Sequence, residues 1–263
     1  MRIGIRAAVL LGLQAILAVA LPVPQNRGGT RIDAVVLVSA DAEWSFVKSF
    51  YSHERYEPSP YGQFFFKDIL LPDKTARHIV IFHGGWGKVA AAGSTQYVID
   101  RWNPPVLVNL GTCGGFEGAI QRWAVVLAAK TVIYDIVERM GNPEEAVTDY
   151  GTTIDLGWLA GGDPAGIRRS VLVSADQDSD PAAIPFLKSK YGAVAADWES
   201  GAIAWTARKN NKKILILRGV TDLVGTAGGE AYDRIEVFRS NTEIVMKRLF
   251  ADLPLWLSRI RQD

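Results

Sequence analysis

The chain has 263 residues, 48% of them hydrophobic and 22% charged, a composition typical of a folded globular protein rather than a disordered one. Its 29 basic and 28 acidic residues give a formal charge of +1, so overall charge favours neither nucleic acid nor an anionic membrane as a partner. One cysteine excludes an internal disulfide, and three histidines without ligand spacing predict no metal site. We expect no cofactor.

Residues 1–20 are predicted to be an export signal peptide. Arg2 and Arg6 precede an apolar stretch over residues 7–20 that ends in small side chains, the pattern of a cleavable signal. The stretch is short for a membrane-spanning helix, which needs about 20 apolar residues. An uncleaved anchor and a misassigned start codon are the alternatives. We therefore expect an exported protein, periplasmic or secreted, without stable membrane insertion after cleavage, a linker over residues 21–30 and a folded domain over residues 31–263.

Short β-branched runs alternate with helical patterns along this domain. Continuous apolar runs suit strands that are buried on both faces of a sheet covered by helices. The predicted strands are residues 34–38, 78–82, 105–110, 125–127, 170–173 and 214–217, and the predicted helices are residues 88–101, 181–191, 199–209 and 232–250. The sequence thus predicts an α/β fold: a single-domain three-layer αβα sandwich with a mixed, largely parallel central sheet.

Glycines and acidic side chains follow four of the predicted strands. These segments are residues 39–43, 83–88, 111–115 and 218–222. In open α/β sheets, ligands bind beyond the carboxyl ends of the strands, and small residues there let the backbone approach a ligand closely. The carboxylates in these segments can act as acid and base. We therefore expect one ligand site where the four segments meet.

Four motifs stand in and around these strand ends. They are Gly-Lys-Val-Ala at residues 87–90, Asn-Leu-Gly-Thr-Cys-Gly-Gly at 109–115, Asp-Trp-Glu-Ser-Gly-Ala-Ile-Ala at 197–204 and Arg-Gly-Val-Thr-Asp at 218–222. The sequence resembles the nucleoside phosphorylase/nucleosidase superfamily, which has the nucleoside phosphorylase type I fold. The resemblance lies in the order and spacing of these four motifs and extends over about residues 32–250. The sequence resembles most the methylthioadenosine/S-adenosylhomocysteine nucleosidase branch.

The resemblance implies two catalytic carboxylates. Asp222 matches the general acid that protonates N7 of a purine, and Glu43 matches the carboxylate that orients and deprotonates the attacking water. An ordinary aspartate, with a pKa of about 4, is ionised at neutral pH, so the acid's role requires burial or late proton delivery. Taken alone, Asp222 could be a helix N-cap and Glu43 a solvated residue of a first helical turn, and both alternatives stay open.

The resemblance also implies a substrate-binding set. Glu199 matches the carboxylate that accepts hydrogen bonds from two ribose hydroxyls and stabilises positive charge on the sugar, although it could also simply start a helix. Trp198 should pack beneath the ribose, and Trp86 should lie near the 5′-substituent. The segment expected beside the base and sugar is Thr112, Cys113 and Gly114. Asp197 is interpreted as a supporting or surface acid.

Two other features have simpler interpretations. Cys113 has no histidine paired with it in the sequence, so packing is favoured over a role as nucleophile. Residues 84–89 are similar to a phosphate-binding loop, but the leading glycine is missing and Val89 replaces the required Ser or Thr. We therefore expect no nucleoside triphosphate site.

Asn109 favours hydrolysis over phosphorolysis. The resemblance implies a phosphate-clamping arginine at this position in phosphorylases, and residues 39–44 carry no arginine either. Without such donors, phosphate loses its charge-assisted partners, and water is the favoured nucleophile. We expect hydrolysis of the N-glycosidic bond of a purine nucleoside or thio-nucleoside, of the methylthioadenosine/S-adenosylhomocysteine type, to free base and sugar. A phosphate-dependent phosphorylase and an exported, non-catalytic nucleoside-binding or storage protein are the alternatives.

Two positions depart from the family pattern. Asp178 stands where the nucleosidases stack a phenylalanine on the purine, and a carboxylate cannot supply that apolar face. Trp86 replaces a smaller aliphatic residue. The base and the 5′-group therefore stay open. Members of the family are commonly dimers or hexamers in which a neighbour closes the pocket, so the resemblance also implies a homo-oligomer.

Overall fold

The computed structural model describes residues 31–164 and 166–261, so the predicted signal and linker lie outside the described residues. The strands are β1 (Ala34–Val38), β2 (Glu57–Pro58), β3 (Gln63–Leu70), β4 (Ala76–His83), β5 (Val106–Phe116), β6 (Val125–Ile133), β7 (Gly151–Thr153), β8 (Ile167–Ser174), β9 (Ala193–Asp197), β10 (Lys213–Gly225) and β11 (Gly228–Gly229). The helices are α1 (Asp41–Phe50), α2 (Gly87–Trp102), α3 (Pro143–Tyr150), α4 (Ile184–Tyr191), α5 (Ser200–Lys209) and α6 (Ile235–Ser258).

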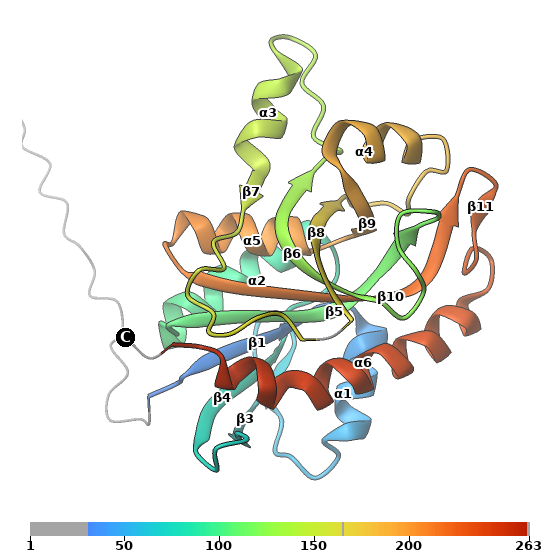
Figure 1. The fold of residues 1–263 in the computed structure, drawn as a ribbon. Coiled ribbons are helices and arrows are strands. Elements are labelled where there is room, and N and C mark those ends of the chain that lie inside the picture. The colour runs from blue at the N-terminus through green and yellow to red at the C-terminus, as the bar shows by residue number, and fades with distance from the viewer. Residues whose placement is uncertain (1–30, 165, 262–263) are drawn as a thin grey trace, which may run out of the picture.

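One mixed sheet forms the middle layer. Its strand order is β11-β10-β6-β8-β9-β5-β1-β4-β3-β2, with β7 paired to β6 and a further pairing between β10 and β5. The long pairs β5–β10, β6–β8 and β1–β4 are parallel, whereas β2, β3, β7 and β11 join by antiparallel pairing. Helices α1 and α6 pack together on one face and α2 with α5 on the other (Figure 1). The predicted single-domain α/β sandwich is confirmed.

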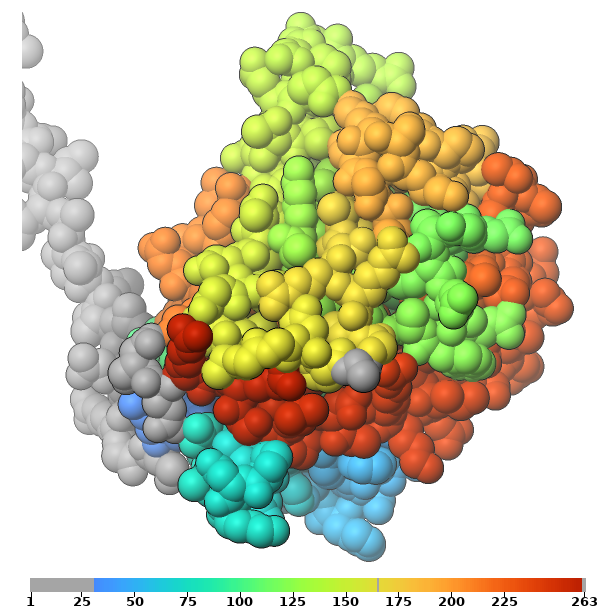
Figure 2. All heavy atoms as spheres, in the orientation of Figure 1, coloured from blue at the N-terminus to red at the C-terminus, as the bar shows by residue number. Residues whose placement is uncertain are grey.

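Helix α6, near the C-terminus, packs against the sheet through β5 and β10. Its buried stripe includes Val245, Leu249 and Leu253, one turn apart, as expected for an amphipathic helix on a core. Figure 2 shows α6, in red, lying across the face of the molecule beside the segment around residue 160, in yellow. There the Ala160 amide donates a 2.8 Å hydrogen bond to the Arg259 carbonyl. Among the described residues, no helix has the length and apolar content needed to cross a membrane.

Five of the six predicted strands are longer than predicted, and two of them, β5 and β10, extend through glycine-rich segments. The run at 105–110 and the run at 214–217 were expected to end before their glycine-rich segments, but β5 and β10 continue to Phe116 and Gly225 and pair along that length. Glycine is usually a strand breaker, and this made residues 111–115 look like a turn. At Gly111 the reason for glycine is space, because a Cβ atom there would lie 2.0 Å from Nη1 of Arg218. Seven further elements were not predicted: α1, α3, β2, β3, β7, β9 and β11.

Candidate active site

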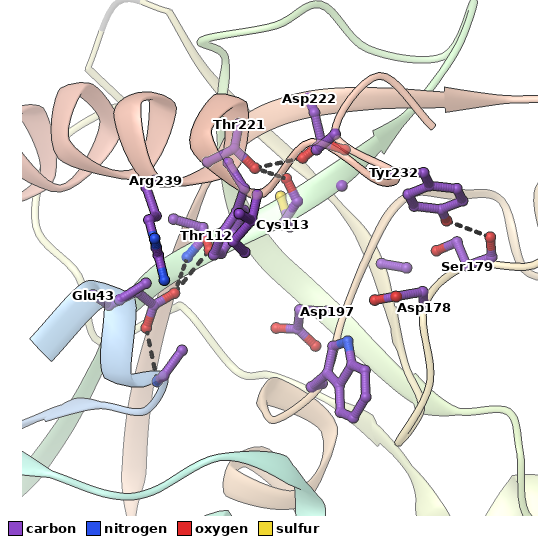
Figure 3. Close-up of a pocket in the computed structure, with 18 of the residues that line it drawn as sticks. Glu43, Thr112, Cys113, Asp178, Ser179, Asp197, Thr221, Asp222, Tyr232 and Arg239 are labelled. Carbon is purple, nitrogen blue, oxygen red and sulfur yellow. Dashed lines mark hydrogen bonds between the residues drawn. The ribbon is translucent and has the colours of Figure 1, made fainter. Parts of the chain in front are cut away.

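A cavity of about 1,040 Å³ opens at the junction of β5, β9 and β10 with the start of α1 and the segment before α6. It brings together all eight residues that the sequence singled out. They are Glu43, Trp86, Thr112, Cys113, Gly114, Trp198, Glu199 and Asp222. Figure 3 shows Glu43 on one side of this cavity and Asp178 on the other, with Asp222 above and Asp197 below.

Glu43 is buried at the start of α1, with 1% of the residue exposed. Its Oε1 atom accepts hydrogen bonds from the Thr112 amide at 2.6 Å and the Thr112 hydroxyl at 2.9 Å. Its Oε2 atom accepts from the Ala40 amide at 3.3 Å, so the carboxylate also caps α1. The alternative of a solvated first-turn glutamate is therefore wrong. Hydrogen bonds from Thr112 on β5 and from Ala40 at the start of α1 therefore hold the Glu43 carboxylate in one orientation.

A fully buried guanidinium, Arg218, lies beneath the cavity among three carboxylates. Its Nε atom is 2.8 Å from Oδ2 of Asp197, Nη2 is 3.5 Å from Oε2 of Glu199, and Nη1 is 3.6 Å from Oε1 of Glu43. Nη2 also donates a 2.9 Å hydrogen bond to Oδ1 of Asn109. Burial alone would lower the pKa of Arg218, but the three carboxylates raise it above its ordinary value. Asp197 is thus a supporting acid and not a surface one.

Sequence reasoning treated Arg218 only as part of a motif. The signal that could have indicated its role is the apolar run that leads directly into this arginine, because an arginine is almost never fully buried unless it is paired. With three carboxylates around one guanidinium, the cluster carries an excess of negative charge when all four groups are ionised. That excess attracts a developing cation and repels an anion.

Glu199 is buried just before α5, and its Oε1 atom accepts a 3.2 Å hydrogen bond from the Gly87 amide. Burial raises the pKa of Glu199; Arg218 opposes this effect, and the charges of Glu43 and Asp197 add to it. The next amide, that of Lys88, donates a 2.7 Å hydrogen bond to Oδ1 of Asp176. The glycine turn therefore points its amides at carboxylates, which agrees with the rejection of a triphosphate site.

Asp222 lies within β10, so the alternative that it caps a helix is wrong. The pairing of β10 with β5 is irregular between Val220 and Asp222, and such a bulge redirects a side chain out of the regular alternation. The Thr221 hydroxyl donates a 2.7 Å hydrogen bond to Oδ1 of Asp222. Burial raises the pKa of Asp222, partly against this hydrogen bond, while the charge of Glu230 adds to the rise. The carboxyl group therefore holds its proton to a higher pH than an ordinary aspartate.

Cys113 is buried in β5 beside these acids. Burial, together with the charge of Asp197, raises the pKa of its thiol well above the ordinary value. The thiol thus stays protonated, as packing requires and a nucleophile does not. Two tryptophans stand at the cavity edge: the ring centroids of Trp86 and Trp198 are 4.8 Å apart, and Trp86 is 64% exposed.

Further residues line the cavity besides the predicted set, among them four that Figure 3 labels. Asp178 and Ser179 follow β8, Tyr232 follows β11, and Arg239 lies on α6. In Figure 3, Arg239 extends toward Glu43, whereas Tyr232 lies at the opposite end. Sequence motifs did not indicate Ser179, Tyr232 or Arg239, because their contacts depend on the fold. The sequence singled out Asp178 only as a departure from the family pattern.

Comparison with known proteins places this chain in a family. The model of the Phosphorylase superfamily matches residues 34–252, and the chain belongs to that family. A 5′-methylthioadenosine/S-adenosylhomocysteine nucleosidase of Bacillus licheniformis is 23% identical over 192 residues, covering 66% of this chain and 81% of its own. The enzyme of the same name from Thermotoga maritima is 28% identical over 176 residues, covering 63% and 72%.

Solved structures show the same fold. The nucleosidase of that name from S. pneumoniae, bound to a transition-state inhibitor, superimposes with a TM-score of 0.66 at 16% identity. The match covers 87% of this chain and 100% of that one. The Helicobacter pylori nucleosidase, bound to butyl-thio-DADMe-Immucillin-A, gives 0.67 at 15% identity, covering 86% and 99%.

Proposed function

We propose that this protein hydrolyses the N-glycosidic bond of a purine nucleoside or thio-nucleoside of the methylthioadenosine/S-adenosylhomocysteine type. The observation that carries the proposal is the placement of Glu43 and Asp222 on different walls of one cavity that also holds Glu199. The names of the similar nucleosidases support the substrate class.

The geometry supports a dissociative displacement at C1′ of the sugar. Water attacks C1′ and passes a proton to Glu43, while the electrons of the C1′–N9 bond move into the base and Asp222 gives its proton to N7. Glu199 accepts from the ribose hydroxyls, and the negative cluster around Arg218 stabilises the cationic sugar in the transition state. The buried position of Asp222 keeps a proton available for the leaving base.

The charge of the cavity favours water over phosphate as the nucleophile. Its acidic lining residues outnumber the basic ones: Asp41, Glu43, Asp178, Asp197, Glu199, Asp222 and Asp233 against Arg234 and Arg239. Arg218 cannot act as a phosphate ligand, because it is fully buried and faces three carboxylates. Asn109 donates to the Leu37 carbonyl and accepts from Arg218, so its amide is engaged at both ends.

The expected homo-oligomer and the expected export also belong to this proposal. Trp86 and Val89, at the start of α2 beside the cavity, are 64% and 85% exposed. An exposed apolar pair at the rim of a site suits a contact with a second copy of the chain. The basic start and apolar stretch of residues 1–20 support export.

The test is release of free base by the purified protein from adenosine, inosine, methylthioadenosine and S-adenosylhomocysteine, with and without added phosphate. Release in phosphate-free buffer is the expected result. A strict requirement for phosphate would establish a phosphorylase instead. Binding of these nucleosides without release, in wild type and in Asp222→Asn alike, would establish a binding protein.

A further inference from the structure

One end of the cavity is built from two connecting segments that meet across it. Residues 177–179 follow β8, and residues 231–235 lie between β11 and the first turn of α6. Figure 3 shows Tyr232 of the second segment between Asp222 and the Asp178–Ser179 pair of the first. This end lies away from Glu43. On the proposed function, a purine whose N7 faces Asp222 and whose sugar lies toward Glu43 places its six-membered ring here.

The ring of Tyr232 is fixed in position. Its hydroxyl donates a hydrogen bond to the Ser179 carbonyl and so joins the two segments. Burial, and next the charges of Asp178 and Asp222, raise the pKa of Tyr232 to about 12, so the hydroxyl keeps the proton that it donates. On its other side the ring packs against Gly229, where a Cβ atom would lie 2.5 Å from Cε1 of Tyr232. A ring held in this way loses little freedom when a ligand binds.

Tyr232 brings an aromatic ring to this end of the cavity. The other aromatic residues that line the cavity are Trp86 and Trp198, which pair with each other, and Phe238 on α6. The sequence led us to expect that Asp178 leaves the base without an apolar face. The structure instead brings a phenol ring to the same end from a segment more than 50 positions further along the chain.

We infer that Tyr232 is the stacking face for the purine and that its hydrogen bond to Ser179 sets the orientation of that face. This inference rests on the proposed function for the direction of the substrate. A planar heteroaromatic base stacks on a phenol ring irrespective of its exocyclic groups, so Tyr232 recognises the class of ligand and not one particular purine. Tyr232 would touch the base but not the sugar.

The experiment compares wild type with Tyr232→Leu, Tyr232→Phe and Gly229→Ala. Binding of free adenine, hypoxanthine and methylthioribose is measured by calorimetry, and kcat/KM is measured for base release. Loss of one base–aromatic stack weakens binding by roughly 5- to 150-fold. We expect Tyr232→Leu to weaken the binding of both free bases by about tenfold or more and to leave the binding of methylthioribose unchanged. Tyr232→Phe keeps the ring, so its affinity for the free bases should fall only a few-fold.

Gly229→Ala serves as an independent variant, because its Cβ atom crowds the Tyr232 ring without removing it. It should weaken the binding of purines and leave the binding of methylthioribose unchanged. Thr226→Ala is the matched control: Thr226 is an exposed residue between β10 and β11 that does not line this cavity. Purine affinity that stays within about twofold of wild type in Tyr232→Leu would overturn the inference. An equal loss for purines and methylthioribose would do the same, because it would indicate collapse of the segment.

The two proposals fail in different ways. If wild type binds free purines through Tyr232 but releases no base from any nucleoside, the proposed hydrolysis is wrong and the stacking role stands. If base is released and Tyr232→Leu changes neither purine affinity nor kcat/KM, only the stacking role is wrong.

Discussion

Arg218 and Asp197 form an ion pair, Nε to Oδ2 at 2.8 Å, in which both side chains are withdrawn from solvent. Glu43 and Glu199 approach the same guanidinium from its other nitrogens. The Arg218 side chain, on β10, therefore links residues from β9, α1 and the start of α5. Its loss affects the fold and the site at once.

Replacing Arg218 by Met should destabilise the protein by about 3–5 kcal/mol, because three buried carboxylates lose their shared counter-charge. Urea unfolding monitored by tryptophan fluorescence measures this change. The control is Arg169→Gln, which removes a half-exposed pair with Asp163 and should cost about 1 kcal/mol or less. Similar losses for the two variants would show that the buried cluster is not a special source of stability.

Replacing Gly111 by Ala should also be destabilising. The new Cβ atom would meet Nη1 of Arg218 at 2.0 Å, so the guanidinium or the strand must move, at about 1–3 kcal/mol. The matched control lies in the same strand: at Gly114 a Cβ atom would be 3.4 Å from Val224, an ordinary contact. Thermal unfolding of both variants separates them. A Gly114→Ala variant that loses as much stability as Gly111→Ala would contradict the steric explanation.

Replacing Asp222 by Asn should reduce base release by about 10²- to 10⁴-fold, the usual contribution of a general acid. Folding should be preserved, because the asparagine amide has nearly the same shape as the carboxyl group. The substitution also removes a group whose charged form is disfavoured by burial. Initial rates of base release and an unfolding curve test both statements. Asp149→Asn, an exposed acid paired with Lys209, is the control for a lost charge.

The pH dependence of base release should respond to Thr221. Because the reaction needs protonated Asp222, kcat/KM should fall as the pH rises through the raised pKa of Asp222. The hydrogen bond from the Thr221 hydroxyl stabilises the ionised carboxylate and lowers that pKa, so Thr221→Ala should move the basic limb to higher pH. Thr221→Ser keeps the hydroxyl and should leave the limb in place. A shift of the limb to lower pH in Thr221→Ala would refute the assignment of Asp222 as the acid.

Sequence patterns predicted the αβα fold, six of its strands and the residues that meet in the cavity. The structure confirms the fold and brings the predicted site residues together. Patterns missed α1, α3 and five strands, among them the buried β9, and they ended β5 and β10 too early. Gly111 looked like a turn residue, although it stands inside β5 to leave room for Arg218. Arg218 and Tyr232 act through partners far away in the chain, and no local spacing reveals such partners.

The hydrogen bond between Tyr232 and Ser179 joins two segments outside the sheet, whereas Arg218 and its carboxylates are rooted in buried strands and helix starts. On the inferred role of Tyr232, the contacts that recognise the base and those that hold the buried charge cluster belong to separate parts of the molecule. On that inferred role, changes in residues 177–179 or 231–235 should alter the binding of the base more than the chemistry at C1′. A scaffold of this kind allows new nucleoside specificities to evolve by loop substitution alone.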